Sequence, residues 1–302
     1  MREEVRARRA AATPVTSSPS RERHDLEWEL GELRKMVDRR VRGEPLQYIL
    51  GNQPFGPIVI KTRAPTLIPR PETEDWTIRL ASLLEDKFPT KDGGERKVLR
   101  MLDLCTGTGC IPILLSHLRR RAGGITVAYG VDISTDAVLL AQENATDQSL
   151  THSSSLTGDD RKSVLDVICA DILQEDFMQV ILSRMEPPFG VITSNPPYIP
   201  LDEYERLPNS VKEWEDQRAL LGDLPPHRSG GGSKGRGLMF YHRIGQIVSA
   251  DGVLGVNGVV ALEVGHTQAE EVRKILEETG KISVTEVWKD PWGVSRVVVG
   301  YR

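Results

Sequence analysis

The segment Asn195-Pro196-Pro197-Tyr198 combines residue types that could hold a planar nitrogen group. The nitrogen of an amide, or of an amine attached to a ring, is a poor nucleophile because its lone pair is delocalised. The side-chain oxygen of Asn195 and the carbonyl of Pro196 could accept the two hydrogens of such a group and aim its lone pair at an electrophile. The two prolines stiffen the backbone and preorganise both acceptors, and Tyr198 offers an aromatic face. We therefore predict Asn195, Pro196 and Tyr198 as catalytic residues that act mainly by positioning.

A glycine-containing turn precedes this segment in the chain. The residues Cys105-Thr106-Gly107-Thr108-Gly109 separate an apolar run from a helical pattern. Glycines allow a backbone to approach a ligand closely, and the start of a helix offers free N–H groups. A tight turn without a ligand shows the same pattern, so the turn alone is weak support for a binding site.

Acidic residues follow the next two apolar runs. Asp132 ends the second run, where an acid in an α/β protein accepts from the hydroxyls of a ribose. Asp171 follows the third run and could accept from an adenine amino group. Acceptors at the ends of successive strands suit an adenosine better than a phosphate, and no P-loop Lys-Ser/Thr pair follows. S-adenosylmethionine, which has ribose and adenine but no pyrophosphate, is the predicted cofactor, and NAD is the alternative.

The elements that must position these residues alternate between strand and helix. Apolar runs predict strands, and helical spacing of apolar residues predicts helices between them. Such alternation predicts a mostly parallel sheet with helices on both faces. No helix separates the last two strands, so one of them should be antiparallel. The predicted strands are 98–104, 125–131, 164–169, 191–194, 259–264, 282–288 and 294–301, and the predicted helices are 111–120, 135–145 and 267–278.

The N-terminal part of the chain shows other patterns. Residues 1–24 are rich in Arg, Ala, Ser and Thr, which indicates a disordered tail or a targeting segment. Apolar residues at helical spacing predict a helix over 25–42. The stretch 45–68 indicates short extended pieces, with turns at Gly51-Asn52 and Pro54.

These patterns divide the chain into parts. We predict a tail at 1–24, an N-terminal substrate-side region at 25–75 and a catalytic domain at 76–302. Two segments of the catalytic domain, 146–162 and 223–237, are rich in Ser, Gly, Asp and Lys and indicate surface insertions.

Cysteine usage and the tail bear on the compartment. The three cysteines lack the paired spacing of a zinc site or a disulfide framework, so we predict no metal and a reducing compartment. The tail resembles a mitochondrial transit segment, although Glu3 and Glu4 are unusual in one. We expect the mitochondrial matrix, with the cytoplasm as the alternative. No apolar run approaches the roughly 20 residues of a membrane helix.

The sequence resembles the HemK/PrmC family, the protein-(glutamine-N5) methyltransferases that modify the Gly-Gly-Gln loop of release factors. The similarity runs from about Arg42 to the C-terminus. Its most specific part is Pro69-Arg70-Pro71-Glu72-Thr73-Glu74 in combination with Asn195-Pro196-Pro197-Tyr198. Further matches are the 43–48 segment, the Gly107 turn, Glu215 with Ala219-Leu220, Leu262-Glu263-Val264-Gly265 with Gln268, and Asp290 with Gly293 and Arg296.

The resemblance implies a fold, a reaction and a set of contacts. The fold would be a Rossmann-like, seven-stranded S-adenosylmethionine-dependent methyltransferase sheet after a short helical N-terminal segment. The reaction would be methyl transfer to the side-chain amide nitrogen N5 of the Gly-Gly-Gln glutamine, with a release factor as the protein partner. The implied cofactor contacts are Cys105, Thr106, Gly107, Thr108, Gly109, Asp132, Asp171, Ile172 and Asn195, and the implied substrate contacts are Asn195, Pro196, Pro197, Tyr198, Glu72 and Glu74.

Three features depart from the family pattern. Cys105 stands where the family usually has Gly, which is tolerable if its backbone angles are ordinary. Asp216 stands where a Pro usually follows the Glu. The region before Gly43 is shorter than the usual helical bundle that helps to grip the release factor.

Two other functions compete with this one. An adenine-N6 or other nucleic-acid amino-methyltransferase faces the same lone-pair problem, but it needs a target-recognition region and must extrude the base. The chain has a net charge of -4, only 5% aromatic residues and no basic run with interleaved aromatics, so no direct binding to nucleic acid is expected. A non-catalytic scaffold is disfavoured because Asp132, Asn195 and Tyr198 are all present.

Overall fold

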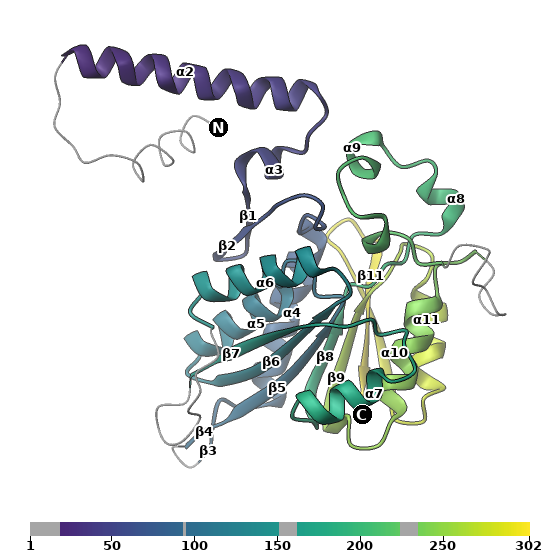
Figure 1. The fold of residues 1–302 in the computed structure, drawn as a ribbon. Coiled ribbons are helices and arrows are strands. Elements are labelled where there is room, and N and C mark those ends of the chain that lie inside the picture. The colour runs from purple at the N-terminus through teal and green to yellow at the C-terminus, as the bar shows by residue number, and fades with distance from the viewer. Residues whose placement is uncertain (1–18, 93–94, 151–161, 224–234) are drawn as a thin grey trace.

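A seven-stranded sheet forms the centre of the computed structural model, which describes residues 19–92, 95–150, 162–223 and 235–302 (Figure 1). The strand order is β10-β11-β9-β8-β5-β6-β7. β11 is antiparallel to both of its neighbours, whereas the pairs from β9 to β7 are parallel. This confirms the predicted mostly parallel sheet with one antiparallel strand. The bounds are β5 Val98–Leu104, β6 Ile125–Asp132, β7 Val164–Cys169, β8 Phe189–Ser194, β9 Leu254–Glu263, β10 Val284–Lys289 and β11 Ser295–Tyr301.

Helices cover both faces of this sheet, as predicted (Figure 1). Alternate residues of β5 point to opposite faces: Leu102 packs in one apolar cluster with Tyr241, and Met101 packs in the other with Trp76. Strands buried on both faces give continuous apolar runs, which is why the sequence shows them clearly. One face carries α4 Pro71–Lys87, α5 Cys110–Arg121 and α6 Thr135–Asp147, and the other carries α7 Phe177–Arg184, α10 Met239–Ser249 and α11 Ala269–Glu277.

Helix α4 was not predicted, and it supplies residues to the site. Pro71 occupies its first position, where a proline needs no hydrogen-bond donor, and Glu72 and Glu74 lie in its first turn. The boundary drawn after residue 75 falls inside this helix. The division of the chain into domains stays a prediction.

The N-terminal region differs from expectation in three places. Helix α2 is Pro19–Val41, so it begins before residue 25, and 45–50 is partly the short helix α3 Leu46–Leu50 rather than extended chain. The predicted turn at Gly51 is present, with φ of 82°. Pro54, however, lies inside a strand opposite Val59, which is possible because the hairpin has only two strands, β1 Asn52–Phe55 and β2 Ile58–Lys61. Within the described ranges, no helix is both long and apolar enough to cross a membrane.

The connections carry short elements. A small hairpin, β3 Lys91–Asp92 with β4 Glu95–Arg96, precedes β5, and α8 Leu201–Tyr204, α9 Asn209–Lys212 and the 3-10 helix η1 Gln217–Ala219 lie between β8 and α10. Most of the two predicted insertions, 151–161 and 224–234, lies outside the described residues. The start of the first one, Thr146 and Asp147, belongs to α6.

Candidate active site

The carboxyl ends of the parallel strands bring the predicted residues to one edge of the sheet. Leu104, the last residue of β5, pairs with Val131 of β6 and with Ser194 of β8. The residues that follow these strands therefore start from neighbouring points. The Ser194 hydroxyl donates to the Leu104 carbonyl at 2.7 Å, which ties the ends of β5 and β8 together. Open α/β sheets bind their ligands at this edge.

A cavity of about 320 Å³ lies at this edge. Its size falls within the range of small-molecule sites, roughly 300–1,000 Å³. Its charged lining consists of four aspartates and one arginine, and apolar side chains from the β6 and β7 ends complete part of the wall. Of the predicted contacts, the lining includes Cys105, Gly107, Asp132, Asp171, Ile172, Asn195 and Pro197; it does not include Thr106, Thr108, Gly109, Pro196, Tyr198, Glu72 or Glu74.

The Asp132 carboxylate is fixed by two backbone amides. Gly107 N–H donates to Oδ2 and Ser134 N–H donates to Oδ1, each at 2.9 Å. Gly107 has φ of 54°, a conformation that favours glycine. Burial raises the pKa of Asp132, and the two amide hydrogen bonds lower it. Each carboxylate oxygen keeps a second lone pair, so Asp132 can still accept from the two hydroxyls of a ribose.

The backbone at Cys105 corrects one expectation. Its φ is 59°, in the left-handed region, so its backbone angles are not ordinary. A side chain there costs roughly 1–2 kcal/mol compared with glycine. The next residue is held to the adjacent strand, because Thr106 N–H donates to the Val131 carbonyl of β6 at 2.9 Å.

The turn after β7 places Asp171 and Ile172 in the cavity wall. Asp171 Oδ1 accepts from Leu173 N–H at 2.9 Å, and Oδ2 accepts from the Gln174 side chain at 3.1 Å. Asp171 therefore shapes its own turn, and each oxygen still has a lone pair that could accept from an adenine amino group. Ile172 is buried, and its carbonyl accepts from Arg243 Nε at 2.6 Å.

The segment after β8 is held from two sides. Asn195 Nδ2 donates to Thr73 Oγ1 of α4 at 3.4 Å. Further along the loop, the Tyr198 carbonyl accepts from Gln268 Nε2 at 2.8 Å. Tyr198 packs partly buried against the core, and burial raises the pKa of its phenol. Asn195 and Pro197 line the cavity, whereas the Tyr198 side chain packs against the core.

Residues with no predicted role also belong to this site. Thr73, Glu263 and Gln268 contact Asn195, Thr73 and Tyr198 respectively. All three lie in motifs that carry the family resemblance, yet spacing along the chain gave them no function. For Glu263 a signal was present, because a carboxylate within a buried apolar strand requires a partner.

The lining of the cavity fits S-adenosylmethionine better than a dinucleotide. The lining has four acidic side chains and one basic side chain, Arg218; the acidic ones are Asp132, Asp171, Asp216 and Asp223. This excess of negative charge suits a cationic sulfonium and repels a pyrophosphate. No cluster of three or more metal-ligating side chains occurs in the part of the chain that the structure describes.

Comparisons with known proteins connect this chain to a family. No protein-family model matches the sequence. A release factor glutamine methyltransferase from Thermodesulfovibrio yellowstonii is 34% identical over 267 residues, 88% of this chain and 80% of the relative. A probable MRF1 mitochondrial N(5)-glutamine methyltransferase, mtq1, from Schizosaccharomyces pombe is 32% identical over 250 residues, 80% of this chain and 70% of that protein. The chain belongs to the release factor glutamine methyltransferase family.

A solved structure also aligns with this family member. The release factor-specific protein-(glutamine-N5) methyltransferase from Alicyclobacillus acidocaldarius shares 21% identity and a TM-score of 0.41, over 78% of this chain and 94% of that one.

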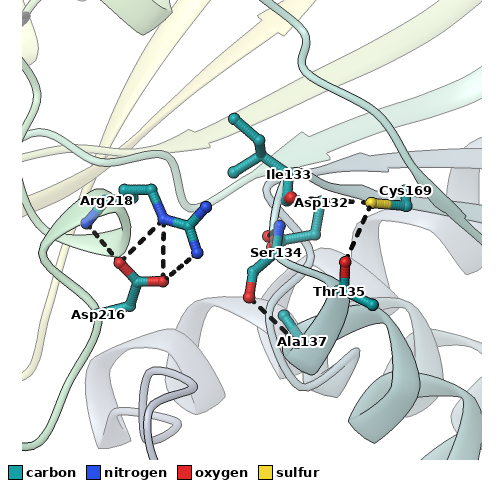
Figure 2. A network of polar contacts seen from close by, with 8 residues as sticks. All are labelled: Asp132, Ile133, Ser134, Thr135, Ala137, Cys169, Asp216 and Arg218. Atoms are coloured by element: carbon teal, nitrogen blue, oxygen red, sulfur yellow. Dashed lines mark hydrogen bonds and ion pairs between the residues drawn. The ribbon is translucent and has the colours of Figure 1, made fainter.

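The second departure from the family pattern, Asp216, has a structural explanation. Its backbone N–H donates to the Pro65 carbonyl at 2.8 Å, a bond that a proline could not form. Its carboxylate accepts from Arg218 N–H at 2.9 Å and pairs with the Arg218 guanidinium at 2.7 Å. The guanidinium points from η1 toward the Asp132 turn (Figure 2), and its charge offsets part of the rise in the pKa of Asp132 that burial and the Asp216 charge produce. The cavity wall is therefore tied across two segments far apart in sequence.

Proposed function

We propose that this protein transfers the methyl group of S-adenosylmethionine to the side-chain amide nitrogen N5 of the Gly-Gly-Gln glutamine in a peptide-chain release factor. The observation that carries the proposal is the position of Asn195. It lines the acidic cavity and is oriented by α4, on the same sheet edge as Asp132. The site thus offers an acceptor for a planar N–H group beside a cavity that suits a cationic nucleoside.

The residues of this chain act mainly by orientation. The Gly107 turn, Asp132 and the Asp171-Ile172 turn would hold S-adenosylmethionine. When bound there, the cofactor supplies an electrophilic methyl group on its sulfonium sulfur. Asn195 Oδ1 and the Pro196 carbonyl accept the two amide hydrogens of glutamine. Both acceptors stabilise the positive charge that develops on the nitrogen as it leaves conjugation.

A methyl-transfer assay tests the reaction and the acceptor together. The protein would be incubated with labelled S-adenosylmethionine and one of three acceptors: a release-factor domain, the same domain with its loop Gln changed to Ala, or double-stranded DNA. Mass spectrometry should locate one methyl group on the Gly-Gly-Gln glutamine. Asn195→Ala should lower turnover by about 10²-fold or more, with cofactor affinity within a few-fold of wild type. Methylation of DNA, or of the domain lacking the glutamine, would refute the assignment.

We also propose that the protein works in the mitochondrial matrix on a release factor of that compartment. The composition of residues 1–24 and the printed name of the Schizosaccharomyces pombe relative support this location. Residues 1–24 fused to a fluorescent protein should direct it to mitochondria in a eukaryotic cell. A reporter that stays in the cytosol would contradict the proposal.

A further inference from the structure

A buried carboxylate lies behind the amide-holding loop. Glu263, the last residue of β9, is only 2% exposed. Its Oε2 accepts from Thr73 Oγ1 at 2.6 Å and from Trp76 Nε1 at 2.8 Å, both on α4. Its backbone carbonyl accepts from the Tyr241 hydroxyl at 2.8 Å. An apolar side chain would fill this position without the desolvation that a carboxylate undergoes. A need for an acceptor at this point explains the glutamate.

The directions of these hydrogen bonds are fixed by chemistry. The Trp76 indole N–H can only donate, so Oε2 of Glu263 must be an acceptor. The Thr73 hydroxyl has a single proton, and the 2.6 Å bond to Glu263 uses it. Thr73 Oγ1 can therefore only accept from Asn195. Its partner 3.4 Å away must be the NH₂ end of the Asn195 amide.

The orientation of Asn195 follows from this sequence of donors and acceptors. With Nδ2 directed at Thr73, Oδ1 is the end left to accept from a ligand. A flipped amide would place two acceptors, Oδ1 and Thr73 Oγ1, against each other and would present N–H groups to the substrate. Those N–H groups cannot accept the hydrogens of another amide.

We propose that Glu263 and Thr73 are positioning residues that form a one-way hydrogen-bond relay, from β9 through α4 to the loop after β8, which sets the orientation of the Asn195 amide. This inference rests on the proposed function, because it assigns Asn195 Oδ1 to the transferred group. The relay joins three segments far apart in the chain. It needs the acceptor oxygen of Glu263 and not its charge, since no proton leaves the substrate through it.

Substitutions at Thr73 test the relay. Thr73→Val is nearly isosteric and removes the hydroxyl, so kcat should fall roughly ten- to a hundred-fold while Kd for S-adenosylmethionine stays within a few-fold. Thr73→Ser should restore most of the lost kcat. Thr77→Val is the matched control, because Thr77 is a buried threonine one turn along α4 whose hydroxyl bonds only the Thr73 carbonyl in the described structure, at 2.6 Å. Its kcat should change less than about three-fold.

Substitutions at Glu263 separate orientation from proton transfer. Glu263→Gln should keep most of the activity lost in Glu263→Met, because the donor-only Trp76 selects the amide oxygen of the glutamine as its partner. In Glu263→Met the Thr73 hydroxyl loses its acceptor and can donate to Asn195 Oδ1 instead. The Asn195 amide would then flip. If Gln were as damaging as Met at a matched melting temperature, the carboxylate would act by charge or as a base, and the relay would be wrong.

A double-mutant cycle provides the readout that a structural role would not move. In Asn195→Asp, two carboxylates compete for the one Thr73 proton. In Glu263→Met/Asn195→Asp, Thr73 is free to donate to the carboxylate introduced in place of the Asn195 amide, and the other oxygen of that carboxylate remains an acceptor. The loss of kcat caused by Asn195→Asp should therefore be at least five-fold smaller in the Met background. Equal losses in both backgrounds would overturn the relay.

The kcat ratios are to be measured on whichever acceptor the wild-type protein methylates, a glutamine or an adenine. A methylated adenine with intact coupling would refute the glutamine assignment and support the relay. A methylated glutamine without coupling would support the glutamine assignment and refute the relay. If Glu263→Met does not fold, the comparison of Thr73→Val with Thr73→Ser decides the question.

Discussion

Replacing Asp132 by Ala should weaken cofactor binding by an amount that the geometry predicts. Both carboxylate oxygens are held by backbone amides at 2.9 Å, which leaves one lone pair on each for a ribose hydroxyl. A hydrogen bond to a charged acceptor contributes about 1.5–3 kcal/mol. Loss of one such bond raises Kd roughly 10- to 150-fold, and loss of both raises it further.

The substitution also acts on the protein itself. It leaves the N–H groups of Gly107 and Ser134 without their partner, so the turn should lose stability as well as affinity. Asp136→Ala is the matched control. Asp136 is exposed in the first turn of α6, near the same turn, and no side-chain hydrogen bond is recorded for it in the described structure. It removes an equal charge, and its Kd should stay within about two-fold of wild type.

Isothermal titration calorimetry with S-adenosylmethionine and S-adenosylhomocysteine measures the effect, and circular dichroism shows whether each variant is folded. If Asp136→Ala also bound the cofactor more weakly than wild type, the loss of affinity in Asp132→Ala would be due to the general electric field of the site rather than to hydrogen bonds. An Asp132→Ala protein that is folded and binds both ligands with wild-type affinity would remove Asp132 from the cofactor site.

Two further predictions concern stability and the loop after β8. Burial raises the pKa of Asp103 to about 7, compared with about 4 in an unfolded chain. The folded protein therefore keeps the proton longer, and its stability should fall as pH rises from about 4 to about 7, by at most on the order of 4 kcal/mol. Asp103→Asn should lose much less stability over that range in urea titrations, and parallel curves for both proteins would contradict the prediction. In Gly237→Ala, the new Cβ would lie 2.0 Å from the Tyr198 carbonyl oxygen, so kcat should fall at least ten-fold, whereas Gly235→Ala, with a similar φ of 62° and no atom within 4 Å, should reduce only thermal stability.

The sheet could be predicted because its strands carry their own signal. Strands such as β6, which is buried along nearly all of its length, appear as apolar runs. Asp132 at the end of β6 and Asn195 after β8 mark where those two strands end. Helix α4 was not predicted, although Pro71 at its first position and the glutamates of its first turn are typical of a helix start. Its packing against β9 and α5 places Trp76 and Leu80 in the core. The short helix α3 owes its place to contacts that are remote in sequence, including the 2.7 Å bond from the Tyr48 hydroxyl to the Thr66 carbonyl.

The site residues also fall into two groups, those that the sequence predicted and those that only the fold brings together. Asp132 and Asn195 follow strands, so their shared location could be predicted from the chain alone. Thr73 and Glu263 lie 190 positions apart, and only the fold brings their side chains into contact. The cysteine at position 105 does not itself indicate the left-handed backbone found there. The only sign of it was the glycine that the family usually has at this position.

The proposed arrangement of Asn195 and Pro196 explains how a neutral amide can serve where a strong base would fail. A general base must match its pKa to the group it deprotonates, and the first proton of an amide is far too weakly acidic for a side chain to remove. A pair of fixed acceptors avoids this requirement, because it stabilises the cation that forms and leaves proton loss until after the methyl group is attached. Such acceptors act only if they cannot turn away. Asn195 is a side chain with two chemically different ends, so its orientation must be imposed from outside, whereas the Pro196 carbonyl is fixed by the backbone. In the proposed relay, the buried Glu263 accepts from both Thr73 and a donor-only indole and so imposes that orientation. This role accounts for a carboxyl group buried at the end of an otherwise apolar strand.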